Sequence, residues 1–280
     1  MACIATEPLD WHEALASYSY PVNLQNFSDR NHFGLEWFDL VLKAGDRTET
    51  MQFEGHFREY AASHLEPWYE VVFWKMFSQR GRADKHTKRT IDQIVKNKTS
   101  ASDLWSRCAA YVESETIVSF RQFQALLVEG RSIATAFTFP AFSCPSRFPM
   151  VDTRIAKYVA SEGSRLGFPS TREVEKTLQK YRGVNNRVLN LDDWTFIKAW
   201  VDWCREMAKR LSADGKRVWR ARDVEMAVFR AWGKPGERKD CSKGKPRYRL
   251  IDESQEDQKA SKDVLTHTEY ERWSNERTRK

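Results

Sequence analysis

A glycine between two apolar stretches, followed at a set distance by a single aspartate, is the feature that most constrains this chain. The first stretch ends at Leu127, and Gly130 precedes the second, 133–139, which we expect to end as a helix at Pro140. A glycine in such a tight turn frees backbone N–H groups to point at a phosphate, and the N-terminus of the next helix adds positive potential. Asp152 follows Gly130 by 22 residues, where another helix is expected to begin. The pattern therefore predicts a phosphate-binding turn with one carboxylate beside it.

Two motifs resemble the helix-hairpin-helix DNA glycosylases of the endonuclease III superfamily. In that family a leucine-containing hairpin ends in Gly-Arg, and after a similar interval Val-Asp-Thr-His carries the catalytic aspartate. Here residues 126–131 read Leu-Leu-Val-Glu-Gly-Arg and residues 151–154 read Val-Asp-Thr-Arg. The family also starts a barrel helix with Pro-aromatic and places a glutamine wedge twelve residues later, a spacing that Pro67 and Gln79 reproduce. Together these motifs span roughly 67–160 of the sequence.

The resemblance implies a set of site residues. Asp152 would be the catalytic carboxylate, and Gln79 would fill the gap that an everted nucleotide leaves in the duplex. The base pocket is expected between the helices that start at Pro67 and Asp152, which selects Tyr69, Glu70, Phe73 and Trp74. In this family the hairpin often holds a monovalent cation. Contacts with DNA are expected from the hairpin and from nearby basic residues: Val128, Glu129, Gly130, Arg131, Ser132, Arg80, Arg82, Arg154 and Lys157.

Ser132 and the cysteines bear on cofactors and on the type of reaction. Members with lyase activity carry a lysine two residues after the hairpin glycine, and Ser132 stands there, so we expect no lysine-dependent strand cleavage. Some members bind an iron–sulfur cluster through four closely spaced C-terminal cysteines. The five cysteines here are scattered without a Cys-x-x-Cys pair, so we expect no cluster, no other metal site and reduced thiols.

Composition points to a polyanionic partner. The 280 residues carry a formal net charge of +7 and the pI is near 9.1, an excess that favours double-stranded DNA but is also common in proteins that bind nothing acidic. No apolar run approaches the roughly 18 residues of a membrane span, and the N-terminus lacks the regions of a secretion signal. We therefore expect a cytoplasmic monomer that contacts no membrane.

Periodicity predicts a mainly α fold with a small N-terminal β-ribbon, and the resemblance implies that the helices are arranged as in a two-lobed helix-hairpin-helix glycosylase. The ribbon is expected at 35–43 and 48–53, followed by a short helix at 56–64. The clearest helix runs from Asp192 or Asp193 to Leu211, where apolar residues hold one stripe over five turns. The expected divisions are an N-terminal segment 1–66 packed on the C-terminal lobe, a barrel lobe 67–152 with its hairpin at 120–137, a C-terminal lobe 153–233 and a charged mobile tail 234–280.

Several alternatives stay open at this stage. A lone aspartate that opens a helix is usually only an N-cap, and Gln79 could be a surface residue that closes a helix. Our first hypothesis is a monofunctional DNA glycosylase for a modified base. In outline the chain resembles the bacterial anti-phage glycosylases that remove glucosylated hydroxymethylcytosine. The alternatives are a repair glycosylase for oxidised or alkylated bases and a non-catalytic DNA-binding protein that keeps the hairpin.

Overall fold

A computed structural model describes residues 9–18, 49–76, 83–127, 133–151, 153–163, 166–169 and 191–233. Within these ranges the regular structure is helical and contains no strand, which confirms the mainly α prediction. The helices are α1 Trp11–Ala16, α3 Thr50–Tyr60, α4 Glu66–Met76, α5 Ala83–Lys96, α6 Ala101–Ser114, α7 Ile117–Leu127, α8 Ile133–Ser143, α9 Thr153–Glu162, α11 Leu191–Ser212 and α12 Ala221–Gly233.

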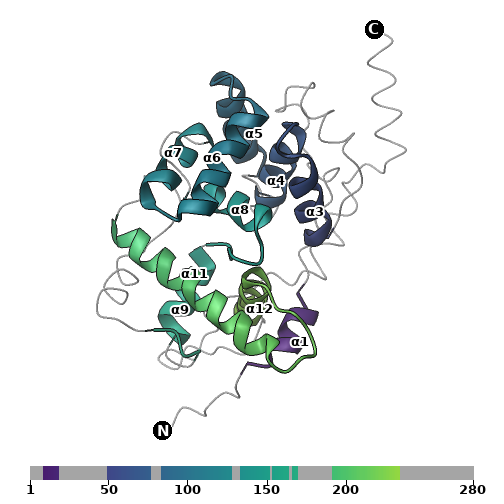
Figure 1. The fold of residues 1–280 in the computed structure, drawn as a ribbon, viewed down its shortest axis with the longest axis vertical. Helices are drawn as coiled ribbons and strands as arrows, with labels where there is room; N and C mark the ends of the chain where they lie inside the picture. The colour runs from purple at the N-terminus through teal and green to yellow at the C-terminus, as the bar shows by residue number, and fades with distance from the viewer. Residues whose placement is uncertain are drawn as a thin grey trace.

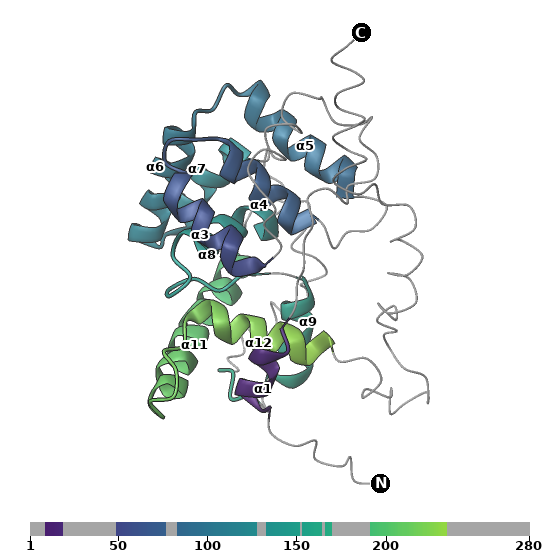
Figure 2. The same cartoon turned by 90° about the vertical axis from the view of Figure 1, so that its right-hand side faces the viewer.

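The described helices form two groups (Figures 1 and 2). In the first group α3, α4, α6 and α7 each pack against α8, and α5 packs against α4 and α7. In the second group α1, α9 and α11 each pack against α12. One continuous apolar core joins the groups, since Tyr111 of α6 contacts Trp194 of α11 with ring centroids 6.2 Å apart. Each group is thus packed around one central, largely buried helix, which is α8 in the first group and α12 in the second.

The N-terminal part of the chain divides between the two groups. α1 packs against α12. α3 instead packs against α4 and α8, so residues 50–60 lie with the helices that follow them in sequence. The expected boundary at residue 66 therefore does not match the packing of α3. Before position 66 the structure describes residues 9–18, which include α1, and residues 49–65, which include α3.

The second strand of the expected ribbon is wrong where it overlaps α3. Residues 50–53 are helical, and the helix begins six residues before the short helix expected at 56–64. The cause is a capping box, in which the Glu49 side chain accepts from the backbone of Gln52 while the Gln52 side chain accepts from the Glu49 N–H at 2.9 Å. Phe53 and Phe57 then bury one face at helical spacing. The first expected strand, 35–43, lies outside the described residues.

α8 also differs from the expectation that it would end at Pro140. The helix continues to Ser143, with the N–H of Cys144 donating to the Pro140 carbonyl at 2.9 Å. A proline inside a helix removes one hydrogen bond and costs about 3 kcal/mol. Packing offsets this cost, because α8 is buried on all sides and Phe142 lies 4.9 Å from Trp74, ring to ring. Tertiary contacts have overridden a local helix-breaking signal.

Candidate nucleic-acid interface

The two helices on either side of the expected phosphate-binding turn pack against each other. α7 ends at Leu127 and α8 begins at Ile133, and both of these side chains are fully buried. The five residues of the turn itself, 128–132, lie outside the described residues. The connection is therefore as short as a helix-hairpin-helix motif requires, and its two ends are anchored in the core.

The third helix of the motif begins directly after the candidate catalytic residue. α9 starts at Thr153, and the residue before the gap, Val151, is fully buried. Asp152 lies outside the described residues, as do the side chains of Arg154 and Lys157. On the other side of the gap, Ile155 and Ala156 are buried in the core. The main chain is thus held by apolar contacts both before and after position 152.

A hydrogen bond from α11 reaches the segment before α9. The indole N–H of Trp200 donates to the carbonyl of Met150 at 2.9 Å, and both residues are buried. Sequence periodicity identified Trp200 as a core residue but gave no sign of this bond, because its partner lies 50 positions away. A buried carbonyl outside regular structure needs such a donor.

The expected wedge and its basic neighbours come in the connection between α4 and α5. Gln79, Arg80 and Arg82 lie outside the described residues, which resume at Ala83. Farther along α5, the side chain of Arg89 is exposed. In this stretch the structure therefore places only the end of α4 and the start of α5, and the residues expected to contact DNA come between these two helix ends.

The residues expected to form the base pocket lie in the core of the described structure, and their role in binding a base stays a prediction. All four are on α4 and at most 4% exposed: Tyr69, Glu70, Phe73 and Trp74. Burial, together with the charge of Glu66, raises the pKa of Tyr69. The helical spacing that suggested a pocket wall is equally that of a helix buried on every side, and α4 is such a helix.

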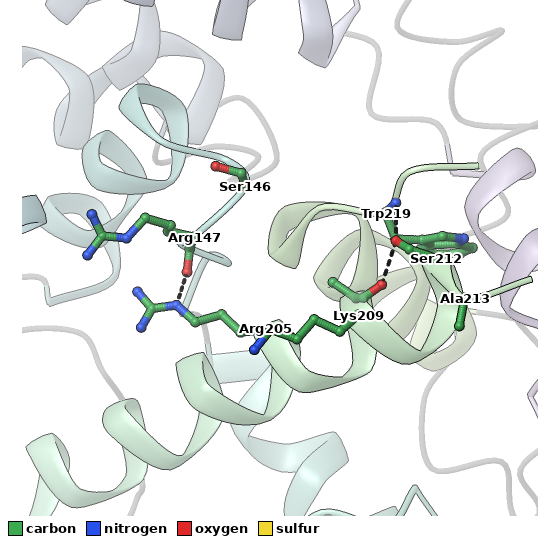
Figure 3. A pocket seen from close by; sticks show the side chains of 8 residues that line it. Ser146, Arg147, Arg205, Lys209, Ser212, Ala213 and Trp219 are labelled. Carbon is green, nitrogen blue, oxygen red and sulfur yellow. Dashed lines mark hydrogen bonds between the residues drawn. The ribbon is translucent and has the colours of Figure 1, made fainter. Parts of the chain in front are cut away.

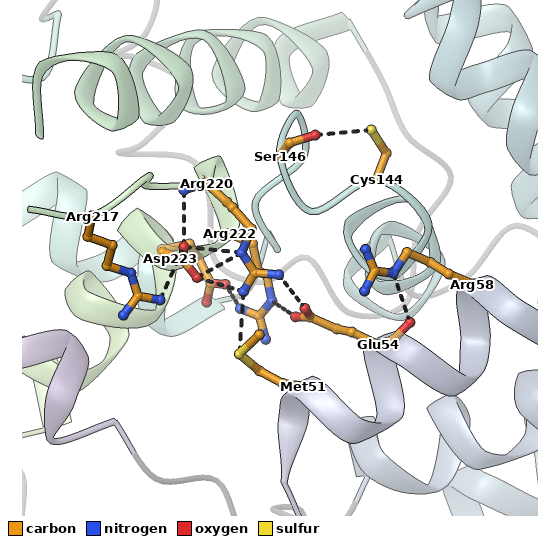
Figure 4. A network of polar contacts seen from close by, with 10 residues as sticks. Met51, Glu54, Arg58, Cys144, Ser146, Arg217, Arg220, Arg222 and Asp223 are labelled. Carbon is orange, nitrogen blue, oxygen red and sulfur yellow. Dashed lines mark hydrogen bonds and ion pairs between the residues drawn. The ribbon is translucent and has the colours of Figure 1, made fainter. Parts of the chain in front are cut away.

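A buried ionic network lies at the start of α12 and reaches α3 (Figure 4). Arg220 donates to Glu54 at 2.8 Å and to Asp223. Arg222 is fully buried, 3.4 Å from Glu54, and also pairs with Glu225. Its guanidinium lies over the ring of Trp74, 5.6 Å from the centroid. The ion pairs of this network therefore connect α3 in the first group of helices with the start of α12 in the second group.

The charges in this network compensate one another. Burial alone would lower the pKa of Arg220, but its hydrogen bond to Asp223 and the charges of Glu54 and Asp223 raise that pKa above its usual value. Removing one member of such a cluster leaves a buried charge without full compensation. Sequence reasoning missed the network, because Arg220 and Glu54 are 166 positions apart.

A basic hollow lies between the loop after α8 and the face of α11 (Figure 3). It has a volume of about 520 Å³, and Arg147, Arg205 and Lys209 line it together with Ser212 and Trp219. Both arginines already pair with Glu115, so the charge of Lys209, whose side chain is exposed, is least compensated there. None of these residues was a candidate from the sequence. The hollow lacks the predicted site residues.

Glu115 joins the break between α6 and α7 to the second group of helices. It follows α6 in a left-handed conformation, with φ of 51°. Its carboxylate accepts from Arg205 at 2.8 Å through both guanidinium Nη atoms and also pairs with Arg147. Burial opposes ionisation, but the hydrogen bonds from Arg205 and Arg147 outweigh it and lower the pKa of Glu115. Charge-assisted contacts therefore hold this loop against α11, through Arg205, and against the segment after α8, through Arg147.

We expect Glu115→Gln to reduce stability by about 1–2 kcal/mol near neutral pH, because the charge-assisted hydrogen bonds are weakened. A carboxylate whose pKa is lowered on folding stabilises above its unfolded pKa and loses that contribution as pH falls through the folded pKa. The difference between Glu115→Gln and wild type should therefore shrink below about pH 4. Urea unfolding across pH measures this effect, with the exposed Glu113→Gln as control. A difference that stays constant down to acidic pH would contradict the assignment.

Comparisons with known proteins do not extend this picture: no family model, no curated protein and no solved structure matches the chain. None of the helices in the described ranges is both long and apolar enough to cross a membrane. Among the same residues, no group of three or more His, Cys, Asp or Glu side chains could hold a metal ion. The described cysteines, Cys108, Cys144 and Cys204, are free thiols.

Proposed function

We propose that this protein is a monofunctional DNA glycosylase that everts a modified base from double-stranded DNA and hydrolyses its N-glycosidic bond. The observation that carries the proposal is the position of three helix ends. α7 and α8 pack together on either side of the Gly130 turn, and α9 begins directly after Asp152. These are the places where the helix-hairpin-helix resemblance requires a turn and a carboxylate. The protein would act as a monomer without an iron–sulfur cluster.

The reaction needs few protein groups. Water bonds to the anomeric carbon as the bond from that carbon to the base nitrogen breaks, and the base leaves with the electron pair and takes up a proton. Positive charge builds on the sugar, so a carboxylate beside it lowers the barrier and can accept a proton from the water. Asp152 has this role in the proposal. Gln79 would fill the space in the duplex, and the 128–132 backbone would hold a phosphate, alone or with a monovalent cation.

The net charge supports a polyanionic partner. The full chain carries +7, and the expected phosphate contacts include Arg80, Arg82, Arg154 and Lys157. For the substrate we propose a hypermodified base such as glucosylated hydroxymethylcytosine in phage DNA, which would make the protein an antiviral enzyme of the cytoplasm. This choice rests on the outline resemblance to the anti-phage glycosylases. Oxidised or alkylated bases in cellular DNA are the competing substrates, and a damage panel separates the two.

The product of the reaction tests the monofunctional assignment. Ser132 cannot form an imine with the sugar, so we expect an abasic site in an unbroken strand, cut only after added alkali or an abasic endonuclease. Borohydride should trap little covalent complex. The measurement is denaturing electrophoresis of end-labelled duplex with and without alkali. Strand cleavage by the protein alone, with trapping that survives blockage of the N-terminal amine, would show that another lysine such as Lys75 or Lys157 enters the site.

A further inference from the structure

The basic hollow between the loop after α8 and the face of α11 holds more positive than negative charge. Three cationic side chains line it: Arg147, Arg205 and Lys209. Both arginines pair with the same carboxylate, that of Glu115. Asp202 also lies 3.7 Å from Arg205, but it pairs with Lys198 at 2.8 Å. The lining therefore keeps an excess of positive charge after its own ion pairs have formed.

Two of these cations keep hydrogen-bond donors for a ligand. Lys209 is exposed and makes no hydrogen bond or ion pair with another residue that the structure describes. Arg147, whose side chain is 44% exposed, donates to Glu115 through Nη2, and its Nε and Nη1 have no hydrogen bond to a described residue. Arg205 differs, because its Nε donates to the Arg147 carbonyl and both Nη atoms donate to Glu115. Lys209 and Arg147 are therefore the residues that can bind a ligand, and Arg205 supports them.

Fixed contacts hold the walls of the hollow (Figure 3). The hydrogen bond from Arg205 Nε to the Arg147 carbonyl, 2.7 Å long, ties the loop after α8 to α11. The guanidinium groups of Arg205 and Arg147 also lie over the ring of Phe148, 5.0 and 5.5 Å from its centroid. On the other side, Ser212 Oγ accepts from the backbone N–H of Trp219 at 2.8 Å. A ligand would therefore meet a lining that is already held in place, which lowers the cost of binding.

The size and chemistry of the hollow favour a phosphate group. Its volume of about 520 Å³ lies in the range of about 300–1,000 Å³ that is typical of small-ligand sites. Arg205 and Lys209 extend from α11 toward the loop that carries Arg147 (Figure 3). A guanidinium and an ammonium are the groups with which proteins bind phosphate oxygens, and a phosphate offsets the excess charge. The exposed hydroxyl of Ser146, on the same loop, adds a further donor.

We propose that this hollow binds a phosphate group through Lys209 and Arg147, with Arg205 holding the loop against α11. The phosphate belongs either to the backbone of DNA or to a small phosphate ester such as a nucleotide. None of the residues predicted for the glycosylase reaction lines the hollow. The inference therefore goes beyond the proposed function and does not depend on base release.

The first arm of the test measures binding of the full-length protein to a labelled, unmodified duplex over a range of salt concentrations. Lys209→Ala should weaken binding by about 10-fold and lower the slope of log Kd against log salt by about one unit, as for one lost phosphate contact. Lys198→Ala is the matched control, because Lys198 is an exposed lysine on the same helix that pairs with Asp202 and does not line the hollow. It should leave both values unchanged.

The second arm titrates the same three proteins with deoxycytidine 5′-monophosphate and with deoxycytidine, which lacks the phosphate, by isothermal titration calorimetry. If the ligand is a small ester, the nucleotide should bind wild type and Lys198→Ala, bind Lys209→Ala about 10-fold more weakly, and deoxycytidine should not bind. A loss confined to the duplex would identify the DNA backbone as the source of the phosphate.

Equal behaviour of Lys209→Ala and Lys198→Ala in both arms would overturn the proposal. So would a wild-type protein that binds neither the duplex nor the nucleotide. Neither arm measures base release, so a protein without glycosylase activity that shows the Lys209 effect would support the phosphate site and reject only the proposed reaction.

Discussion

Asp152→Asn is expected to lose base release by about 10²–10³-fold or more, because in the proposed mechanism this carboxylate stabilises the positive charge that develops on the sugar. Binding to duplex DNA should be retained or become tighter, since the variant also removes the repulsion between this carboxylate and the phosphates of the DNA. Single-turnover release of free base gives the rate, and a binding assay at fixed salt gives Kd. The two measurements together separate a catalytic loss from a folding defect.

A second carboxylate serves as the control for this prediction. Asp202 lies on α11, is half exposed and pairs with Lys198 at 2.8 Å. Asp202→Asn removes the same charge from a surface that the proposal does not use, and it should release base at the wild-type rate. Retained activity in Asp152→Asn would reject the mechanism, and equal losses in the two variants would show that the effect is one of total charge.

Glu54→Ala is expected to destabilise the protein by about 3–5 kcal/mol, a large part of the stability of a typical domain. The substitution takes one carboxylate from Arg220 and from the fully buried Arg222, and it leaves positive charge in a dry environment. It also opens a space between α3 and the start of α12. Urea unfolding followed by circular dichroism gives the change in the free energy of unfolding.

Glu59→Ala is the matched control, since Glu59 is on the same helix but is exposed. Surface substitutions of this kind usually change stability by less than about 0.5 kcal/mol. If Glu54→Ala were as stable as Glu59→Ala, the network would not hold the two groups of helices together. The buried arginine would then have to find its compensation elsewhere.

Much of the helical fold could be predicted, because amphipathic spacing is a local signal. The stripe that ends at Leu211 lies on α11, and the helix expected after Asp152 is α9, Thr153–Glu162. The failures came where a signal was weak or was overridden. The capping box at Glu49 begins a helix in a segment that looked like a strand, and core packing carries α8 past Pro140. Neither outcome can be inferred from periodicity alone.

The turn at Gly130 and Asp152 lie outside the described residues, so the sequence-local part of the candidate site stays a prediction. The structure shows only the helix ends around them: α7 ends at Leu127, α8 begins at Ile133 and α9 begins at Thr153. The base pocket stays a prediction, because α4 is buried on every side, with Glu70 and Trp74 included, and helical spacing gives no indication of which face would meet a ligand. Contacts between distant segments, such as Trp200 with Met150, are fixed by tertiary packing and leave no local signature.

Direct measurement of base release tests the central claim. The purified full-length protein is incubated with phage DNA that carries glucosylated hydroxymethylcytosine, with unmodified DNA, and with duplexes containing oxidised or alkylated bases, and released bases are identified by mass spectrometry. The account predicts free modified base and abasic sites in unbroken strands, with the hypermodified DNA as the preferred substrate. Binding to all of these DNAs with no base released from any of them would contradict it and would leave a non-catalytic DNA-binding protein.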